Sequence, residues 1–153
     1  MRYPAVLTRE GRHTLAGFPS CPGCQTFAEP GEGIEGMAQE ALEGWLEAHL
    51  VSGQAPPRPP RRAPKGRVIW AEVPAKLAVK LDLRWARQAA GLTQAQLAEL
   101  AGVSQPMIAK LEHPDYNPTI DTLEKVARAL GVKLRVSLEA QERAASMGAE
   151  SLG

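Results

Sequence analysis

The stretch Thr93–Glu112, TQAQLAELAGVSQPMIAKLE, decides the fold of the second half of this 153-residue chain. Two short helical segments meet at Gly102, which can take the positive φ that a tight turn between helices requires. Thr93 and Ser104 stand where the N-caps are expected, and Pro106 is tolerated only in a first helical turn. This spacing predicts a helix-turn-helix. Its apolar inner face is predicted to be formed by Leu97, Ala101, Val103, Ile108 and Leu111, with Ala98 as the small residue where the two helices cross.

The segment from Leu81 to about Val132 resembles the lambda-repressor-like (XRE) helix-turn-helix family. The resemblance implies a bundle of four or five helices whose second motif helix enters the major groove of DNA. Gln94 and Gln105 match that family's two Gln positions. Gln94 would donate to a phosphate from a helix N-terminus, and Gln105 would pair with adenine. We expect the exposed DNA-binding face to include Gln94, Ser104, Gln105, Met107 and Lys110.

The charge of this region is poor for a DNA-binding protein. Residues 82–131 carry five basic and six acidic residues, and affinity for DNA rises with the number of phosphates neutralised. Capped helices and glycine turns also occur in helical proteins that bind no DNA. We therefore expect weak binding by one copy, helped by dimerisation or by basic residues elsewhere in the chain.

The first half of the chain has a different pattern. RYPAVLTRE (2–10) alternates in polarity and predicts a strand, RHTLAGFP (12–19) predicts its hairpin partner, and QTFAE (25–29) predicts a third strand. From Ile34 to Leu50 apolar residues recur with helical period, which predicts one amphipathic helix. VIWAEV (68–73) predicts a further strand. A small sheet and one helix must cover each other, because neither buries its apolar side alone.

Between that helix and the last strand lies a Pro/Arg-rich connector at residues 56–66, predicted to be extended because its prolines exclude a helix. Beyond residue 74 the pattern is helical, with Leu77, Leu81, Trp85 and Ala89 spaced four apart. KLRVSL (133–138) alternates and predicts a late strand, followed by a frayed tail. The predicted organisation is an α+β domain at 1–74, an all-α helix-turn-helix domain at 75–132, and a strand and flexible tail at 133–153.

The motif CPGC (21–24) has the spacing of a redox pair or of half a zinc site. A redox pair needs a thiol at a helix N-terminus, whereas Cys24 leads into a strand. A zinc site needs two further ligands, and the chain has no other cysteine and three scattered histidines. Pro22-Gly23 suits a type II turn, and we interpret the motif as a turn.

The first half of the chain also resembles the HicB antitoxin family. The resemblance rests on the Tyr-Pro strand, on FPSCPGC (18–24), on the helix with EALEGWLEAHL (40–50) and on the Pro-rich segment after it. Phe18, Pro19, Pro22, Gly23 and Cys24 occupy the family's motif positions, whereas Cys21 replaces a usually apolar residue. The resemblance implies a partial RNase H-like domain without active-site carboxylates. Glu10 is the one acidic residue in 1–28, so we expect no catalytic site, no metal and no cofactor.

Members of this family are antitoxins of type II toxin–antitoxin systems. The resemblance therefore implies a HicA-like mRNA interferase as protein partner, operator DNA as a second partner, repression of the chain's own operon, and a homodimer or tetramer. Residues 1–56 have net charge −4 and residues 57–153 net charge +5. An acidic front half suits a basic toxin. The helix face of Glu35, Glu40, Glu43 and Glu47 is one candidate toxin surface, or else an ordinary solvated face.

A second function class stays open. The chain can be a helix-turn-helix regulator whose front domain (residues 1–74) senses a ligand, or senses a redox state through Cys21 and Cys24. We find no signal peptide and no apolar run long enough to span a membrane. A cytoplasmic location without membrane contact is therefore expected.

Overall fold

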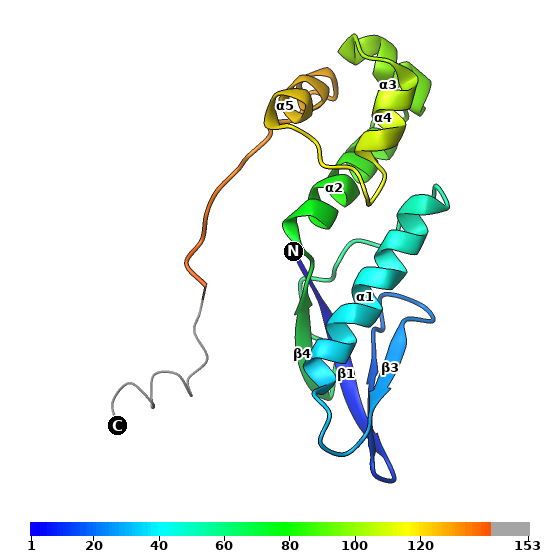
Figure 1. Cartoon of the computed structure of the whole chain (residues 1–153), viewed down its shortest axis with the longest axis vertical. Coiled ribbons are helices and arrows are strands. Elements are labelled where there is room, and N and C mark those ends of the chain that lie inside the picture. The colour runs from blue at the N-terminus through cyan, green and yellow to red at the C-terminus, as the bar shows by residue number, and fades with distance from the viewer. Residues whose placement is uncertain (142–153) are drawn as a thin grey trace.

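The computed structural model describes residues 1–141 of the chain. An antiparallel sheet with one helix across it is followed by four further helices, and Figure 1 shows these two parts end to end. This is the predicted arrangement of an α+β part followed by an all-α part. No helix among the described residues has the length and hydropathy of a membrane span.

The sheet has four strands in the order β3-β2-β1-β4, and all neighbours run antiparallel. The strand bounds are Arg2–Glu10 for β1, His13–Gly17 for β2, Gln25–Ala28 for β3 and Arg67–Glu72 for β4. In β1, Tyr3, Ala5 and Leu7 point to the same face and are buried, as the alternation predicts. The four predicted strands of the first half are confirmed.

Helix α1 (Ile34–Val51) covers that face of the sheet (Figure 1). Its buried residues are Ala38, Leu42, Leu46 and Leu50. They pack in one core with Tyr3, Ala5 and Leu7 of β1. The other face of α1 stays in solvent, so this helix displays its acidic residues outward.

The Pro/Arg-rich connector forms neither helix nor strand, as predicted, but it is fixed in place. The Trp85 indole Nε1 donates to the Pro56 carbonyl at 2.8 Å, and the Tyr3 hydroxyl donates to the Pro57 carbonyl at 2.7 Å. The Arg58 guanidinium lies 5.0 Å from the Trp85 ring centroid, a cation–π geometry. Two aromatic side chains thus hold the connector against the folded part.

Helix α2 (Ala75–Ala89) belongs to both parts of the molecule. Leu77, Leu81 and Trp85 pack into the core beneath α1, whereas Leu83 packs into a second core with the later helices. The predicted apolar row ends earlier than the spacing indicated, because Ala89 is exposed. The division of the chain at residue 74 stays a prediction, since α2 contributes to two cores.

The remaining helices build the second core. They are α3 (Gln94–Ala101), α4 (Gln105–Leu111) and α5 (Ile120–Ala129). Leu97, Ile108 and Val126, one from each helix, are almost completely buried in it. This confirms the predicted helix-turn-helix and the helix after it.

The predicted strand KLRVSL does not form within the single chain. Residues 133–141 form neither helix nor strand, and Figure 1 shows them leaving α5 as an extended segment. Leu134 packs on the second core, but Val136 and Leu138 are exposed by 66% and 100%. Alternating polarity makes a strand only where a partner strand is within reach, and residues 1–141 place none there. The part of the predicted tail at 142–153 lies outside the described residues.

Candidate nucleic-acid interface

Local signals in the sequence fix the geometry of α3 and α4. The Thr93 hydroxyl accepts from the Gln96 amide and the Gln96 side chain accepts from the Thr93 amide, a complete capping box at the start of α3. Gly102 ends α3 with φ 68°, a left-handed conformation that suits glycine. The Ser104 hydroxyl caps α4 by accepting from the Met107 amide at 3.3 Å. These features confirm the predicted caps and turn.

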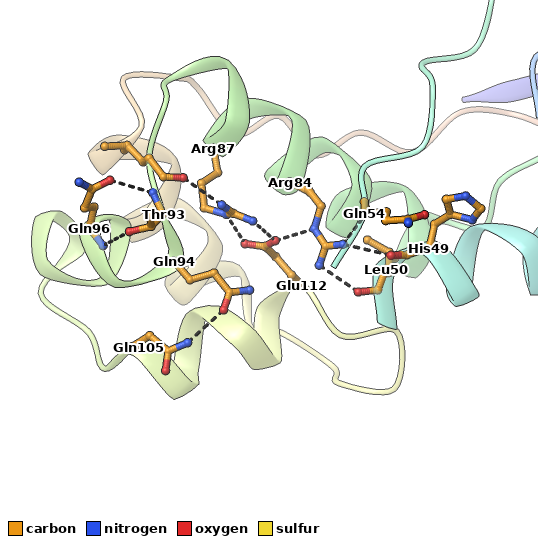
Figure 2. A network of polar contacts seen from close by, with 11 residues as sticks. His49, Leu50, Gln54, Arg84, Arg87, Thr93, Gln94, Gln96, Gln105 and Glu112 are labelled. Carbon is orange, nitrogen blue, oxygen red and sulfur yellow. Dashed lines mark hydrogen bonds and ion pairs between the residues drawn. The ribbon is translucent and has the colours of Figure 1, made fainter. Parts of the chain in front are cut away.

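The two predicted glutamines meet at the surface. Gln105 Nε2 donates to Gln94 Oε1 at 3.0 Å, and Figure 2 shows the two side chains joined between α3 and α4. Gln94 is half-buried and Gln105 is exposed. Each amide keeps a further donor and an acceptor lone pair, so the pair can still offer hydrogen bonds to a phosphate or a base edge.

The other predicted DNA-binding residues differ in their exposure and in what their side chains contact. Lys110 is exposed on α4, as expected. Ser104 is exposed, but its hydroxyl is engaged as the helix cap. Met107 departs from the expected exposed face, because it is half-buried against the second core with Tyr116. The structure therefore brings Gln94, Gln105 and Lys110 to the surface as available polar groups, with Met107 serving mainly in packing.

A buried charge network lies behind this face, and sequence reasoning missed it. Glu112, which follows α4 directly, accepts from Arg84 Nε at 2.7 Å and from Arg87 Nε at 2.7 Å (Figure 2). Arg84 and Glu112 are each 2% exposed. Burial by itself would raise the pKa of Glu112, but the hydrogen bonds and charges of Arg87 and Arg84 outweigh it and hold that pKa below its ordinary value.

The same Arg84 guanidinium reaches the end of α1. It donates to the carbonyls of His49, Leu50 and Gln54 at 3.4, 3.0 and 2.7 Å (Figure 2). The last carbonyls of a helix lack partners within the helix, and a cation there is favourable. Arg84 thus satisfies the C-terminus of α1 while it holds the residue that ends α4.

A buried lysine adds a second contact to the loop after α4. Lys80 is fully buried, its ammonium donates to the Tyr116 carbonyl, and it lies 5.8 Å from the Tyr116 ring centroid. Burial, together with the neighbouring charge of Lys76, lowers the pKa of Lys80 to about 8. Together with Arg84, it ties α2 to the segment that leads into α5.

The CPGC motif is a turn, as interpreted from the sequence. The Cys24 amide donates to the Cys21 carbonyl at 2.9 Å and Gly23 has φ 84°, which is the pattern of a type II turn. Both thiols are free and buried. Burial raises the pKa of Cys21 to about 12 and that of Cys24 to about 11, which is opposite to the shift that activates a redox thiol. Residues 1–141 contain no group of three or more His, Cys, Asp or Glu placed to hold a metal ion.

The predicted acidic face lies on the solvent side of α1. Glu35, Glu40 and Glu47 are exposed and Glu43 is half-buried. The Glu43 carboxylate accepts from Gln39 Nε2 at 2.8 Å, and the same amide nitrogen donates to the Glu72 carbonyl of β4. Three of the four carboxylates are therefore exposed to solvent, whereas Glu43 is linked through Gln39 to β4.

A capped helix-turn-helix with two polar amides at its surface is the architecture of the helix-turn-helix class of DNA-binding proteins, here with an added α+β domain. Comparison with known proteins agrees. Residues 83–136 match a family model described as Helix-turn-helix. A segment of 43 residues, which is 28% of this chain, is also 51% identical to an immunity repressor protein of Bacillus phage phi105. The segment covers 30% of that protein.

Two relatives extend over nearly the whole chain, and both come from Photorhabdus laumondii. Antitoxin HicB 1 is 31% identical over 141 residues, which is 91% of this chain and 88% of that protein. Antitoxin HicB 2 is 28% identical over 136 residues, which is 89% of this chain and 95% of that protein. The chain belongs to the HicB antitoxin family.

Proposed function

We propose that this protein is the antitoxin of a type II toxin–antitoxin system, that it neutralises a HicA-like mRNA interferase, and that it represses its own operon. The observation that carries the proposal is the likeness to two HicB antitoxins over about nine-tenths of the chain, front domain and helix-turn-helix included. Residues 1–74 would bind the toxin, and residues 75–132 would bind operator DNA.

The α3–α4 face supports the DNA-binding part of the proposal. Gln105 is the first residue of α4 and lies exposed beside Gln94. In this role Gln94 donates to a phosphate at the start of α3, while Gln105 hydrogen-bonds the edge of an adenine. Lys110, five residues further along α4, adds a charge toward the backbone of the DNA.

The acidic face of α1 supports the toxin-binding part. An interferase that binds RNA needs a basic surface, and Glu35, Glu40, Glu43 and Glu47 offer it a complementary one. Charge complementarity would speed association and would cover the surface that RNA needs. Neutralisation then amounts to competition with RNA for one face of the toxin.

Dimerisation supplies two helix-turn-helix units for two half-sites. Residues 133–138 remain candidates for the contact between copies, because Val136 and Leu138 are exposed and the backbone of this segment is unpaired within residues 1–141. The pairing of this segment with its copy would turn two weak binding units into one stronger unit.

A growth assay tests the antitoxin function. The small reading frame next to this gene is expressed alone and then together with this chain. Growth arrest that this chain relieves is the expected result, and arrest without relief contradicts the proposal. For the DNA part, Gln105→Ala should lose preference for the operator over unrelated DNA by about tenfold or more, as one bidentate base contact contributes roughly 1–3 kcal/mol, and it should still relieve the arrest.

A further inference from the structure

The helix-turn-helix part has few cations to offer to phosphates. It carries five basic residues between 82 and 131, and Arg84 and Arg87 are both engaged by Glu112 inside the protein. Lys125 points its ammonium to the Gly102 carbonyl at 3.4 Å. Since affinity for DNA depends on the number of phosphates neutralised, a protein that binds DNA through this domain needs cations from elsewhere in the chain.

A set of such cations lies at the end of the connector. We call Arg61, Arg62, Lys65 and Arg67 the basic strip. All four residues are exposed, and none forms an ion pair with a carboxylate of residues 1–141. Arg58, in the same segment, differs from them because it is stacked on Trp85. The basic strip therefore holds four charges within seven consecutive residues that no contact inside the described chain neutralises.

The basic strip is held at both of its ends. Before it, the Pro56 and Pro57 carbonyls accept from Trp85 and Tyr3, and Pro56 is buried. Its last residue, Arg67, is the first residue of β4 and is paired with Leu7 of β1. A segment already ordered loses little conformational entropy when it binds, so its charges act more effectively than those of a free tail.

Arg62 of the basic strip lies on the side of the sheet opposite α1, whereas Arg67 points to the α1 side because it is paired with Leu7. Arg62, Pro60 and Pro64 line a shallow hollow of about 280 Å³ together with Pro4. Pro4 points away from the face that α1 covers, because its neighbours Tyr3 and Ala5 point toward α1. The Arg62 guanidinium is therefore presented on the side of the sheet away from the acidic residues of α1.

We propose that the basic strip is a second DNA-binding surface, which contacts the phosphates of DNA flanking the site bound by α3 and α4. The inference rests on the proposed operator binding. Arginine and lysine without apolar anchors between them suit a phosphate backbone, whereas the core of a protein interface is depleted of charge and enriched in aromatic residues. The contact would supply affinity without sequence preference.

The test measures how the affinity of the full chain for DNA varies with salt. Two fluorescent duplexes of equal length are used, one from the region upstream of the chain's own reading frame and one of unrelated sequence. The slope of log affinity against log salt counts phosphate contacts at about 0.9 each. Arg61→Gln/Arg62→Gln should lower that slope by about 2 for each bound chain, on both duplexes.

Three variants serve as controls. Arg9→Gln/Arg12→Gln removes the same charge from the exposed β1–β2 hairpin, away from the connector, and should leave the slope unchanged. Arg61→Lys/Arg62→Lys keeps the charge and should keep the slope. Gln105→Ala should lose the preference for the upstream duplex but retain the slope, which separates the basic strip from the proposed operator contact.

The outcomes are distinct. A slope that Arg61→Gln/Arg62→Gln leaves at the wild-type value overturns the proposal. The proposal is also overturned if Arg61→Gln/Arg62→Gln changes the sedimentation coefficient of the protein alone but not its affinity for DNA. That result would assign the basic strip to a contact between protein chains. If the wild type shows no preference for the upstream duplex, the proposed operator binding fails, and the slope on the unrelated duplex still decides whether the basic strip binds phosphates.

Discussion

Arg84 and Glu112 form a fully buried ion pair in which the Arg84 Nε lies 2.7 Å from Glu112 Oε1. The two residues come from α2 and from the end of α4, and the same guanidinium donates to the carbonyls that end α1. One side chain thereby joins the helix that carries the acidic face to the helix that carries Gln105. The front domain and the helix-turn-helix are connected through a polar contact as well as through the apolar sides of α2.

This contact predicts a large loss of stability when Arg84 is removed. Arg84→Met leaves the Glu112 carboxylate with only Arg87 and removes one donor from each of three carbonyls, so the free energy of unfolding should fall by about 3–5 kcal/mol. Urea unfolding measures it. Arg84→Met with Glu112→Leu should cost less than the sum of the two single changes, because neither charge is then left alone. Additive losses would contradict the coupling of these two residues.

The same carboxylate predicts how stability depends on pH. The pKa of Glu112 is lowered in the folded state, so the folded protein holds this group ionised at pH values where the unfolded chain already binds a proton. Its contribution is fully present above about 4.5, the ordinary value, and is lost as pH falls through the lowered pKa. Unfolding free energies measured from neutral pH downward should fall more steeply for the wild type than for Glu112→Gln. Equal slopes would refute the assignment.

The two thiols should be inert in the folded protein. Their pKa values are raised to about 12 and about 11 by burial, so little thiolate exists at pH 8. Iodoacetamide labelling should proceed slowly in buffer and rapidly in denaturant, as followed by mass spectrometry. Operator binding should be equal with and without reductant. Rapid labelling of the native protein, or binding that responds to reductant, would favour the alternative of a redox-sensing regulator.

Charge reversal tests the acidic face of α1. Glu40→Lys/Glu47→Lys should weaken binding of a HicA-like toxin by about tenfold or more, since like charges at an interface oppose association. Glu124→Lys/Glu139→Lys changes the net charge equally at exposed positions outside the front domain and is the matched control. Binding is measured by calorimetry at two salt concentrations. Equal affinity of both double variants would assign these carboxylates to a solvated helix face.

Two glycines should respond to alanine in opposite directions. Gly102 has φ 68°, so Gly102→Ala should cost about 1–2 kcal/mol of stability. Gly36 lies within α1 with no atom near the position of an added Cβ, so Gly36→Ala should stabilise by about 0.5–1 kcal/mol. Thermal unfolding of both variants gives the comparison. A loss at Gly36 as large as that at Gly102 would contradict this backbone argument.

The helix-turn-helix could be predicted from the sequence because its signals are local. Thr93, Gly102 and Ser104 each act on residues within a few positions, so their spacing defines two helices and the turn. The strands and α1 could be predicted for the same reason, through periodicity alone. The position of Gln105 at the start of α4 followed from Pro106, and its contact with Gln94 fits that placement.

The rest depends on pairs far apart in the chain. Arg84 and Glu112 are 28 positions apart, and Arg84 and Gln54 are 30 positions apart, so no local pattern marks either contact. The spacing of Leu77, Leu81, Trp85 and Ala89 predicts one apolar face, although α2 divides its apolar residues between two cores. The alternation in KLRVSL predicts a strand. A pattern of this kind shows a preference for extended backbone, but it does not show whether a partner strand is present.

Because α2 packs into both cores, side-chain packing fixes the orientation of the acidic face of α1 relative to Gln105, and no flexible hinge separates the two within residues 1–141. Here a cut at residue 74 would take Leu77, Leu81 and Trp85 away from the front core and Arg84 away from the end of α1. Substitutions on the surface of α3 and α4 leave both cores intact, whereas replacement of the whole helical part would not.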